Sequence, residues 1–115
     1  MSFVVIASKD VLNNGEMKSI KLNGHEFLLA RIEDNFFCTD NRCPHMGGDL
    51  SLGKLERTVV TCPRHHSQFD ISDGHIIHWT DFSGIKLSLG KILKSPRPLK
   101  TYSVKVEGEK ILVDI

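Results

Sequence analysis

The chain has 115 residues, which is enough for one domain with a single hydrophobic core and too few for a second catalytic domain beside it. Its 15 basic and 14 acidic residues nearly cancel, and a net charge of +1 gives no strong field to hold nucleic acid or an anionic membrane. We therefore expect one domain over residues 1–115, with neither nucleic acid nor a membrane as its partner.

The apolar runs of the chain are short. The longest, such as Phe3 to Ala7 and Phe27 to Ala30, have the length of a strand, and no basic stretch precedes the first of them. The sequence thus predicts neither a membrane span nor a signal peptide. The three cysteines are an odd number, which argues against a disulfide framework and favours metal binding in a reducing cytoplasm.

The N-terminal half contains the pattern of a hairpin followed by a third strand. Residues 16–22 and 25–32 flank Asn23-Gly24, a dipeptide that accepts the positive φ values of a type I′ turn. Residues 36–39 then form the third predicted strand, after a short polar turn.

The C-terminal half is also strand-like. Residues 58–61 (TVVT) are β-branched throughout and run directly into Cys62, which places this cysteine at the end of a rigid strand. The stretch LKTYSVKVEGEKILVDI, residues 99–115, alternates apolar and polar residues on both sides of Gly108 and predicts a second hairpin. Almost no segment has a sustained helical period. The predicted fold class is all-β, a small antiparallel sandwich or barrel.

The residues that could bind a metal or carry out chemistry lie in two segments, NRCPHMGGDL at 41–50 and TCPRHHSQFD at 61–70. Each combines a cysteine with a histidine, as Cys43-x-His45 and Cys62-x-x-His65, with 16 residues between His45 and Cys62. An ordinary zinc finger has its cysteines as one pair and its histidines as another. A mixed loop suits a two-iron cluster, in which each loop gives its thiolate to one iron and its imidazole to the other.

These segments resemble the Rieske [2Fe–2S] proteins, whose signature is C-x-H followed at a distance by C-x-x-H. The likeness continues into the QFD and DG that follow the second segment, and into the C-terminal hairpin. The resemblance implies a Rieske fold with a cluster-binding subdomain at about residues 41–79. It also implies one [2Fe–2S] cluster, with Cys43 and Cys62 as ligands of one iron and His45 and His65 as ligands of the other.

The charge of such a cluster explains its two histidines. Two ferric ions, two sulfides and two thiolates sum to zero when both imidazoles are neutral, so an added electron enters a neutral centre. The electron is expected on the iron that the imidazoles hold. The rings of His45 and His65 should then lie at an exposed tip, where they can meet a partner or lose a proton.

Several neighbours of the ligands are candidates for tuning the cluster. His66 stands where the family commonly has glycine, so the second loop is expected to differ in shape or to carry strain. Its side chain either points into solvent or tunes the potential and helps a partner to dock. The hydroxyl of Ser67 donates either to a bridging sulfide, which would raise the potential, or to a backbone partner. Pro63 restricts the second loop, and Gly47 and Gly48 allow main-chain amides to approach the sulfides or serve as turn residues.

The branch of the family follows from what is missing. Rieske subunits of respiratory and photosynthetic complexes have an extra cysteine in each loop, and here the corresponding positions are Gly48 and Arg64. The resemblance therefore points to the soluble ferredoxin branch, which passes electrons from a reductase to a terminal oxygenase or another acceptor. Its potential is expected in the lower part of the range of roughly −150 to +300 mV.

We interpret the chain as an electron carrier and not as an enzyme. No nucleotide-binding or flavin-binding pattern is visible, and the chain ends too soon to contain an oxygenase domain. Two alternatives stay open. One is the small Rieske-like subunit of a larger reductase of the nitrite-reductase type, and the other is a structural module with a single zinc ion.

Outside the two loops the predictions are structural. Cys38 lies in a strand-like stretch and is expected to be a small buried hydrophobe, while Trp79 is expected to cover an edge of the core. Residues 80–95 are longer than the family's usual connection and offer a partner surface. Arg42 and Arg64 flank the ligands and either steer an acidic partner or serve solubility.

Overall fold

The computed structural model describes residues 2–44, 47–64, 66–79 and 97–115. This part of the chain is built almost entirely of short strands, and none of its helices is long and apolar enough to cross a membrane. The elements in chain order are β1 (Phe3–Ser8), η1 (Lys9–Val11), β2 (Met17–Leu22), β3 (His25–Ile32), β4 (Asn35–Asp40), η2 (Leu50–Leu52), β5 (Lys54–Glu56), β6 (Val59–Thr61), β7 (Gln68–Asp70), β8 (Ile76–His78), β9 (Thr101–Tyr102), β10 (Val104–Glu107) and β11 (Lys110–Asp114).

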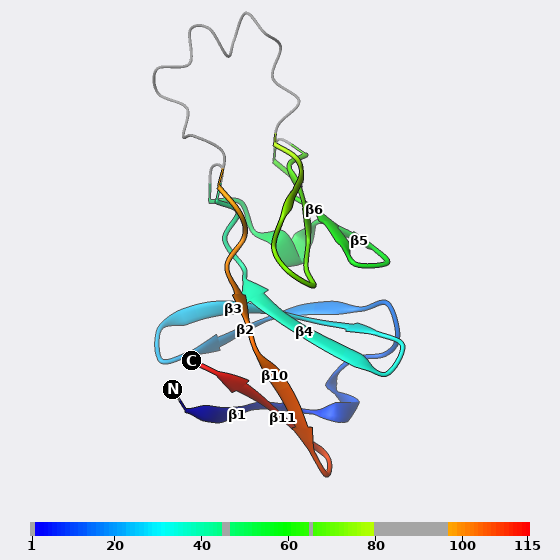
Figure 1. Ribbon diagram of the computed structural model, residues 1–115, viewed down its shortest axis with the longest axis vertical. Helices are drawn as coiled ribbons and strands as arrows, with labels where there is room; N and C mark the ends of the chain where they lie inside the picture. Colours follow the sequence, from blue (N-terminus) through cyan, green and yellow to red (C-terminus); the bar gives the residue numbers. More distant parts are fainter. Residues whose placement is uncertain (1, 45–46, 65, 80–96) are drawn as a thin grey trace, which may run out of the picture.

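The strands form three antiparallel sheets, with the orders β1-β11-β10, β2-β3-β4-β9 and β5-β6-β7-β8. Figure 1 shows the β2-β3-β4-β9 sheet in the middle, with the β1-β11-β10 sheet on one side and the β5–β8 region on the other. The predicted all-β, antiparallel class is confirmed. The extent of the single domain stays a prediction.

The first hairpin forms as predicted. Asn23 and Gly24 have φ values of 53° and 81°, so both occupy the left-handed region that a type I′ turn requires. Leu22 pairs with His25 directly across the turn, and the register continues to Met17 opposite Ala30. Because the turn fixes the register, it also decides which side of the sheet each residue of β3 faces.

Strand β3 is buried on both sides. Phe27 and Leu29 contribute to the core beneath the β1-β11-β10 sheet, whereas Leu28 and Ala30 contribute to the core shared with the β5–β8 region. This two-sided burial explains the uninterrupted apolar run noted in the sequence, which an exposed antiparallel strand would lack. Each fully buried leucine or phenylalanine contributes about 1.5–3 kcal/mol to folding.

The C-terminal hairpin differs from the predicted pattern at its first strand. The sequence suggested one strand through Tyr102, Val104 and Val106, but the chain changes sheets at Ser103. Tyr102 pairs with Cys38 of β4, while Val104 pairs with Val113 of β11. In the middle sheet the hydroxyl of Tyr102 donates to Asp40 Oδ1 at 2.6 Å, a long-range contact that local alternation does not reveal.

Candidate cluster site

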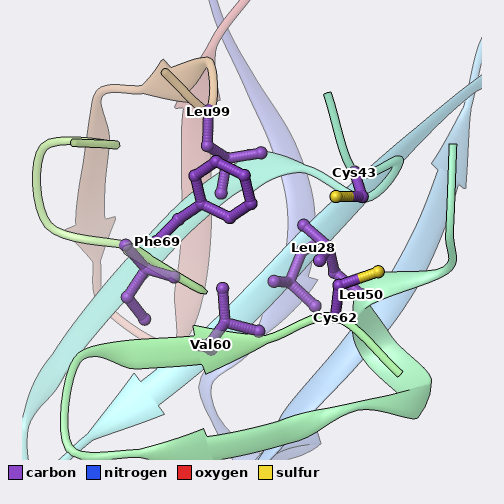
Figure 2. Packing of buried hydrophobic residues seen from close by; sticks show 9 residues of the cluster. Leu28, Cys43, Leu50, Val60, Cys62, Phe69 and Leu99 are labelled. Atoms are coloured by element: carbon purple, nitrogen blue, oxygen red, sulfur yellow. The ribbon is translucent and has the colours of Figure 1, made fainter. Parts of the chain in front are cut away.

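Two buried cysteines begin the loops that the sequence singled out. Cys43 lies three residues after β4, and Cys62 directly follows β6. They expose only 3% and 2% of their surface, and both belong to the hydrophobic cluster that contains Leu50 and Phe69. Figure 2 shows the two cysteines near one end of this cluster, beside Leu28 and Leu50. The fold therefore brings together two thiols that are 19 positions apart in the chain.

The two loops have the same backbone hydrogen bonds. The amide of Cys43 donates to Gly48 O and the amide of Cys62 donates to Ser67 O, both at 2.8 Å. In return, Gly47 N donates to Cys43 O at 2.8 Å, and His66 N donates to Cys62 O at 3.1 Å. Each loop thus closes on its own cysteine by bonds to the fourth and fifth residues after it.

The fourth position after each cysteine has a left-handed backbone. Gly47 has a φ of 73° and His66 a φ of 61°. The sequence suggested that His66 would reshape the second loop or strain it. The shape of the loop is not altered, because its closing hydrogen bonds match those of the first loop. His66 instead carries backbone strain, because its Cβ makes the left-handed region unfavourable. The side chain of His66 is exposed.

The two loops touch at Gly48. An ideal Cβ on this glycine would lie 2.6 Å from Cys62 Sγ and 3.0 Å from Cδ of Arg64, so no larger residue fits without a shift. Gly48 and Arg64 are the positions that the resemblance matched to the extra cysteines of other Rieske proteins, and they are in contact. None of the three cysteines of the chain is in a disulfide. The two loops thus present one thiol each, and Gly48 leaves space beside the thiol of Cys62. This arrangement fits the two thiolate donors that a Rieske cluster needs.

Ser67 has a backbone partner. Its side chain is completely buried, and its hydroxyl donates to the carbonyl oxygen of Trp79. A serine hydroxyl has one proton to donate, so this bond supports the backbone alternative and not a bond to a sulfide. Trp79 in turn packs edge-on against Phe69, with ring centroids 6.2 Å apart, and covers an edge of the core as predicted.

A surface hollow lies beside the second loop. Its volume is about 450 Å³, and it is lined by Leu52, Cys62, Pro63, His66 and other residues of β5 to β7. Leu52 is 74% exposed, which is unusual for a leucine and leaves an apolar side chain at the rim. Pro63 is also exposed.

Arg42 does not stand alone at the surface. Its Nη2 donates to Glu26 Oε1 at 2.9 Å, and its Nη1 lies 3.4 Å from the carbonyl oxygen of Gly47. This pairing links the first loop to β3. It gives Arg42 a role within the molecule, which the sequence interpretation did not include.

Cys38 is the buried hydrophobe that the sequence predicted. It exposes 1% of its surface and packs with Leu29 and Ile111. Burial, followed by the nearby charge of Asp40, raises the pKa of the thiol to about 12. The thiolate is therefore essentially absent at neutral pH, and Cys38 is a packing residue.

A polar cluster at the start of β3 was not anticipated. His25 Nε2 and the hydroxyl of Tyr102 lie 2.7 and 2.6 Å from the same oxygen of Asp40. Burial, followed by the hydrogen bond to Asp40, raises the pKa of Tyr102 above its usual value. These three residues come from the neighbouring strands β3, β4 and β9 and join them where β4 ends and leads into the first loop.

His45, His65 and the 80–95 insertion lie outside the described residues. Without the two histidines, the described part of the chain contains no group of three or more metal-binding side chains. The ligand set and the exposed-tip prediction therefore stay predictions.

Relatives of the chain have similar sequences over its whole length. The chain is 31% identical over 115 residues to the ferredoxin component of biphenyl 2,3-dioxygenase from Rhodococcus jostii (strain RHA1), covering 100% of this chain and 94% of that protein. It is 30% identical over 112 residues to the ferredoxin component of the naphthalene 1,2-dioxygenase system from Pseudomonas putida, covering 96% and 91%.

A solved structure gives the same result. The ferredoxin of carbazole 1,9a-dioxygenase from Nocardioides aromaticivorans IC177 superposes with a TM-score of 0.77 at 26% identity, over 98% of this chain and 97% of that one. The model of the Rieske [2Fe-2S] domain family matches residues 2–103. The cofactor and the fold that the two cysteine–histidine segments implied are those of this family. The chain is a member of the Rieske [2Fe-2S] domain family.

Proposed function

We propose that the chain is a one-electron carrier that takes electrons from a reductase and passes them to an oxygenase in the cytoplasm. Its whole length would form one domain, with the cluster in a subdomain at about residues 41–79. The observation that carries the proposal is the pair of equivalent loops, each of which begins at a buried cysteine and closes on it by the same hydrogen bonds.

The residues of the loops would share the work of holding the cluster. Cys43 and Cys62 would bind one iron and His45 and His65 the other, and the cluster would accept and release one electron. The buried position of both cysteines supports this assignment, since it keeps water from the sulfur side of the site. The backbone bonds that close each loop would fix the direction of its ligands before the cluster assembles.

The proposed partners follow from the relatives and from the surface. Relatives of matching length are named as ferredoxin components of dioxygenase systems, which supports an oxygenase as acceptor. Exposed Leu52 and His66 line the same hollow next to the second loop. An apolar side chain beside a polar rim is a common feature of protein interfaces, so a redox partner would cover this part of the molecule.

A visible absorption spectrum tests the cofactor directly. Freshly purified protein would be measured before and after dithionite, with iron, zinc and acid-labile sulfide assayed on the same sample. We expect a coloured protein that bleaches on reduction and holds two irons and two sulfides per chain. A colourless protein with one zinc and no sulfide, also after anaerobic reconstitution, would establish the zinc alternative.

The partner is tested separately. The dithionite-reduced protein, freed of excess reductant, would be mixed with the oxygenase component of a dioxygenase system, and reoxidation would be followed by absorption. We expect the oxygenase component to reoxidise the reduced protein after mixing, in the absence of oxygen. Stable co-purification with a large reductase subunit, and no transfer to the oxygenase, would favour the reductase-subunit alternative.

Adjacent histidines provide a test of the ligand assignment. His65→Ala should abolish the native cluster, whereas His66→Ala should leave two irons and two sulfides per chain. His66 is the matched control because it neighbours His65 and its side chain is exposed. Loss of the cluster in the His66 variant alone would reverse the assignment.

A further inference from the structure

Glu26, the second residue of β3, accepts hydrogen bonds from both residues that precede Cys43 in the first loop. Its main-chain carbonyl accepts a hydrogen bond from Asn41 N at 3.2 Å. Its two carboxylate oxygens accept from different side chains, Oε1 from Arg42 at 2.9 Å and Oε2 from Asn41 at 3.3 Å. One residue of the middle sheet thus contacts both residues that lead into Cys43.

Asn41 also forms hydrogen bonds with residues at the C-terminal end of the first loop. It is completely buried, and its amide nitrogen also donates to Asp49 Oδ1 at 2.8 Å. Its amide oxygen accepts from Ser51 N at 3.0 Å, and its carbonyl accepts from Leu50 N at 2.9 Å. A buried amide with all its groups paired has one stable orientation, so Asn41 fixes the distance between the beginning and the end of the loop.

Arg42 makes the second connection. Its guanidinium bonds to Glu26 through Nη2, while Nη1 approaches the carbonyl of Gly47, the left-handed residue of the loop. The hydrogen bonds from Arg42 and then from Asn41 hold the pKa of the Glu26 carboxyl below its usual range. Glu26 is therefore charged throughout the neutral range, when Arg42 is charged as well.

We propose that Glu26 is a positioning residue for the cluster, which acts through Asn41 and Arg42 to hold the first loop where Cys43 can bind iron opposite Cys62. This inference rests on the proposed function, since it assumes that the two loops hold a cluster. Glu26 itself touches neither cysteine in the contacts described, so its effect is on the position of the loop. Outer partners of this kind orient the ligands of a metal and slow its loss.

The inference is tested on anaerobically purified protein with its cluster in place. Glu26→Gln and Arg42→Gln each remove one charge of the pair, and the double variant removes both. Release of iron to an excess of chelator should be about tenfold faster in each single variant. The double variant should be no faster than the single ones, because the two side chains act as one unit.

The electron paramagnetic resonance spectrum of the reduced cluster separates position from charge. A displaced loop changes the g-values of both single variants in the same direction. If Glu26 and Arg42 acted only through their charges, the two variants would shift the reduction potential in opposite directions, with unchanged g-values and release rates. That result would overturn the inference, as would faster release with unchanged g-values, which marks a loss of general stability alone.

Two sets of variants complete the experiment. Lys105 and Glu107 form another exposed ion pair, 3.5 Å apart on β10, and Lys105→Gln and Glu107→Gln are matched controls that should release iron at the wild-type rate. Arg42→Lys keeps the charge but has one terminal nitrogen, so an intermediate release rate is expected if the glutaminyl variants fail to fold. Wild-type protein without iron and sulfide would refute the proposed function, whereas equal release from wild type and variants would refute only the role of Glu26.

Discussion

The loops that begin at Cys43 and Cys62 reach the same backbone shape with different residues. Their closing hydrogen bonds are equivalent, but the left-handed position holds Gly47 in the first loop and His66 in the second. The position after it holds buried Gly48 in one and buried Ser67 in the other. The shape is therefore set by the closing bonds and not by one required residue type, and the differences between the loops lie in the space and the contacts that they leave around the cysteines.

Some contacts that join the loops to the rest of the molecule differ in kind. The first loop is linked to β3 and η2 through charged groups, Glu26 with Arg42 and Asp49 with Ser51. The second loop is linked to Trp79 through the hydroxyl of Ser67. A contact of a carboxylate depends on pH and a serine–carbonyl contact does not, so these contacts should respond differently to substitution and to acid.

The largest effect is expected where the loops touch. Gly48→Ala places a Cβ 2.6 Å from Cys62 Sγ, and the neighbouring Arg64 side chain at 3.0 Å limits the room to shift. Overpacking of this kind costs about 1–3 kcal/mol. Because the displaced atom belongs to a proposed ligand, we also expect a clear loss of iron and sulfide per chain, measured by metal and sulfide analysis.

Gly47→Ala is the control for this prediction. An ideal Cβ on Gly47 meets nothing within 4 Å, so only the left-handed backbone, with a φ of 73°, opposes the substitution. This variant should lose about 1 kcal/mol and keep its cluster. Equal cluster loss in both variants would mean that backbone conformation, and not contact between the loops, controls assembly.

A smaller effect is expected at Ser67, the counterpart of Gly48. Ser67→Ala removes the hydrogen bond from a completely buried hydroxyl to the carbonyl of Trp79, at a cost of about 0.5–1.5 kcal/mol. The reduction potential should not change, because the hydroxyl proton is directed to the carbonyl. A thermal melt at one scan rate and a potentiometric titration measure the two quantities. A lower potential in the variant would restore the sulfide-bonded alternative.

At the left-handed position of the second loop, a substitution should change stability in the opposite direction, because there glycine would replace a residue with a Cβ. His66→Gly removes the steric strain of a Cβ at a φ of 61°, which stabilises the fold by about 1 kcal/mol. The extra flexibility of glycine in the unfolded chain offsets part of this gain. We expect the thermal midpoint to rise by at most about 4 °C. Arg57→Gly, at a φ of 55° in the turn between β5 and β6, is the matched control and should rise similarly. A lower midpoint for His66→Gly alone would show that its side chain stabilises the loop.

The sequence was informative wherever the signal was local. The Asn23-Gly24 turn and the strands around it were predicted because a type I′ turn has a strong residue preference and fixes the register. The spacing of Cys43 and Cys62 in their segments indicated the correct family, which the match over residues 2–103 confirms. Both signals are contained within a few neighbouring residues.

What the sequence did not reveal depends on contacts between distant residues. No sequence pattern singled out Asn41, and only the structure shows it buried between Glu26 and Asp49. Tyr102 followed the alternation of the last hairpin, yet it joins the middle sheet through Asp40. For Ser67 the residue type allowed two partners, and the choice of the Trp79 carbonyl depends on how β7 and β8 are packed.

The carboxylate of Asp49 in the first loop predicts the smallest effect, a dependence of stability on pH. Partial burial would raise the pKa of Asp49, but hydrogen bonds from Ser51 and Asn41 outweigh it and hold the pKa below the usual range. A depressed carboxyl pKa stabilises the fold above the unfolded value of about 3.9, and this contribution is lost as the pH falls through the folded value. Asp49→Asn should therefore be less stable than wild type at pH 7, by at most about 1 kcal/mol.

The gap between Asp49→Asn and wild type should narrow as the pH falls below about 4, because the carboxyl of the wild type then binds a proton and the amide does not. Thermal midpoints of both proteins at several pH values would show it. Asp34→Asn is the control, since that side chain is fully exposed and its ion pair with Arg31 is long, at 3.7 Å. It should differ little from wild type at any pH. A constant gap for Asp49→Asn across the range would mean that the hydrogen-bonding geometry at Asp49, and not its charge, holds the first loop.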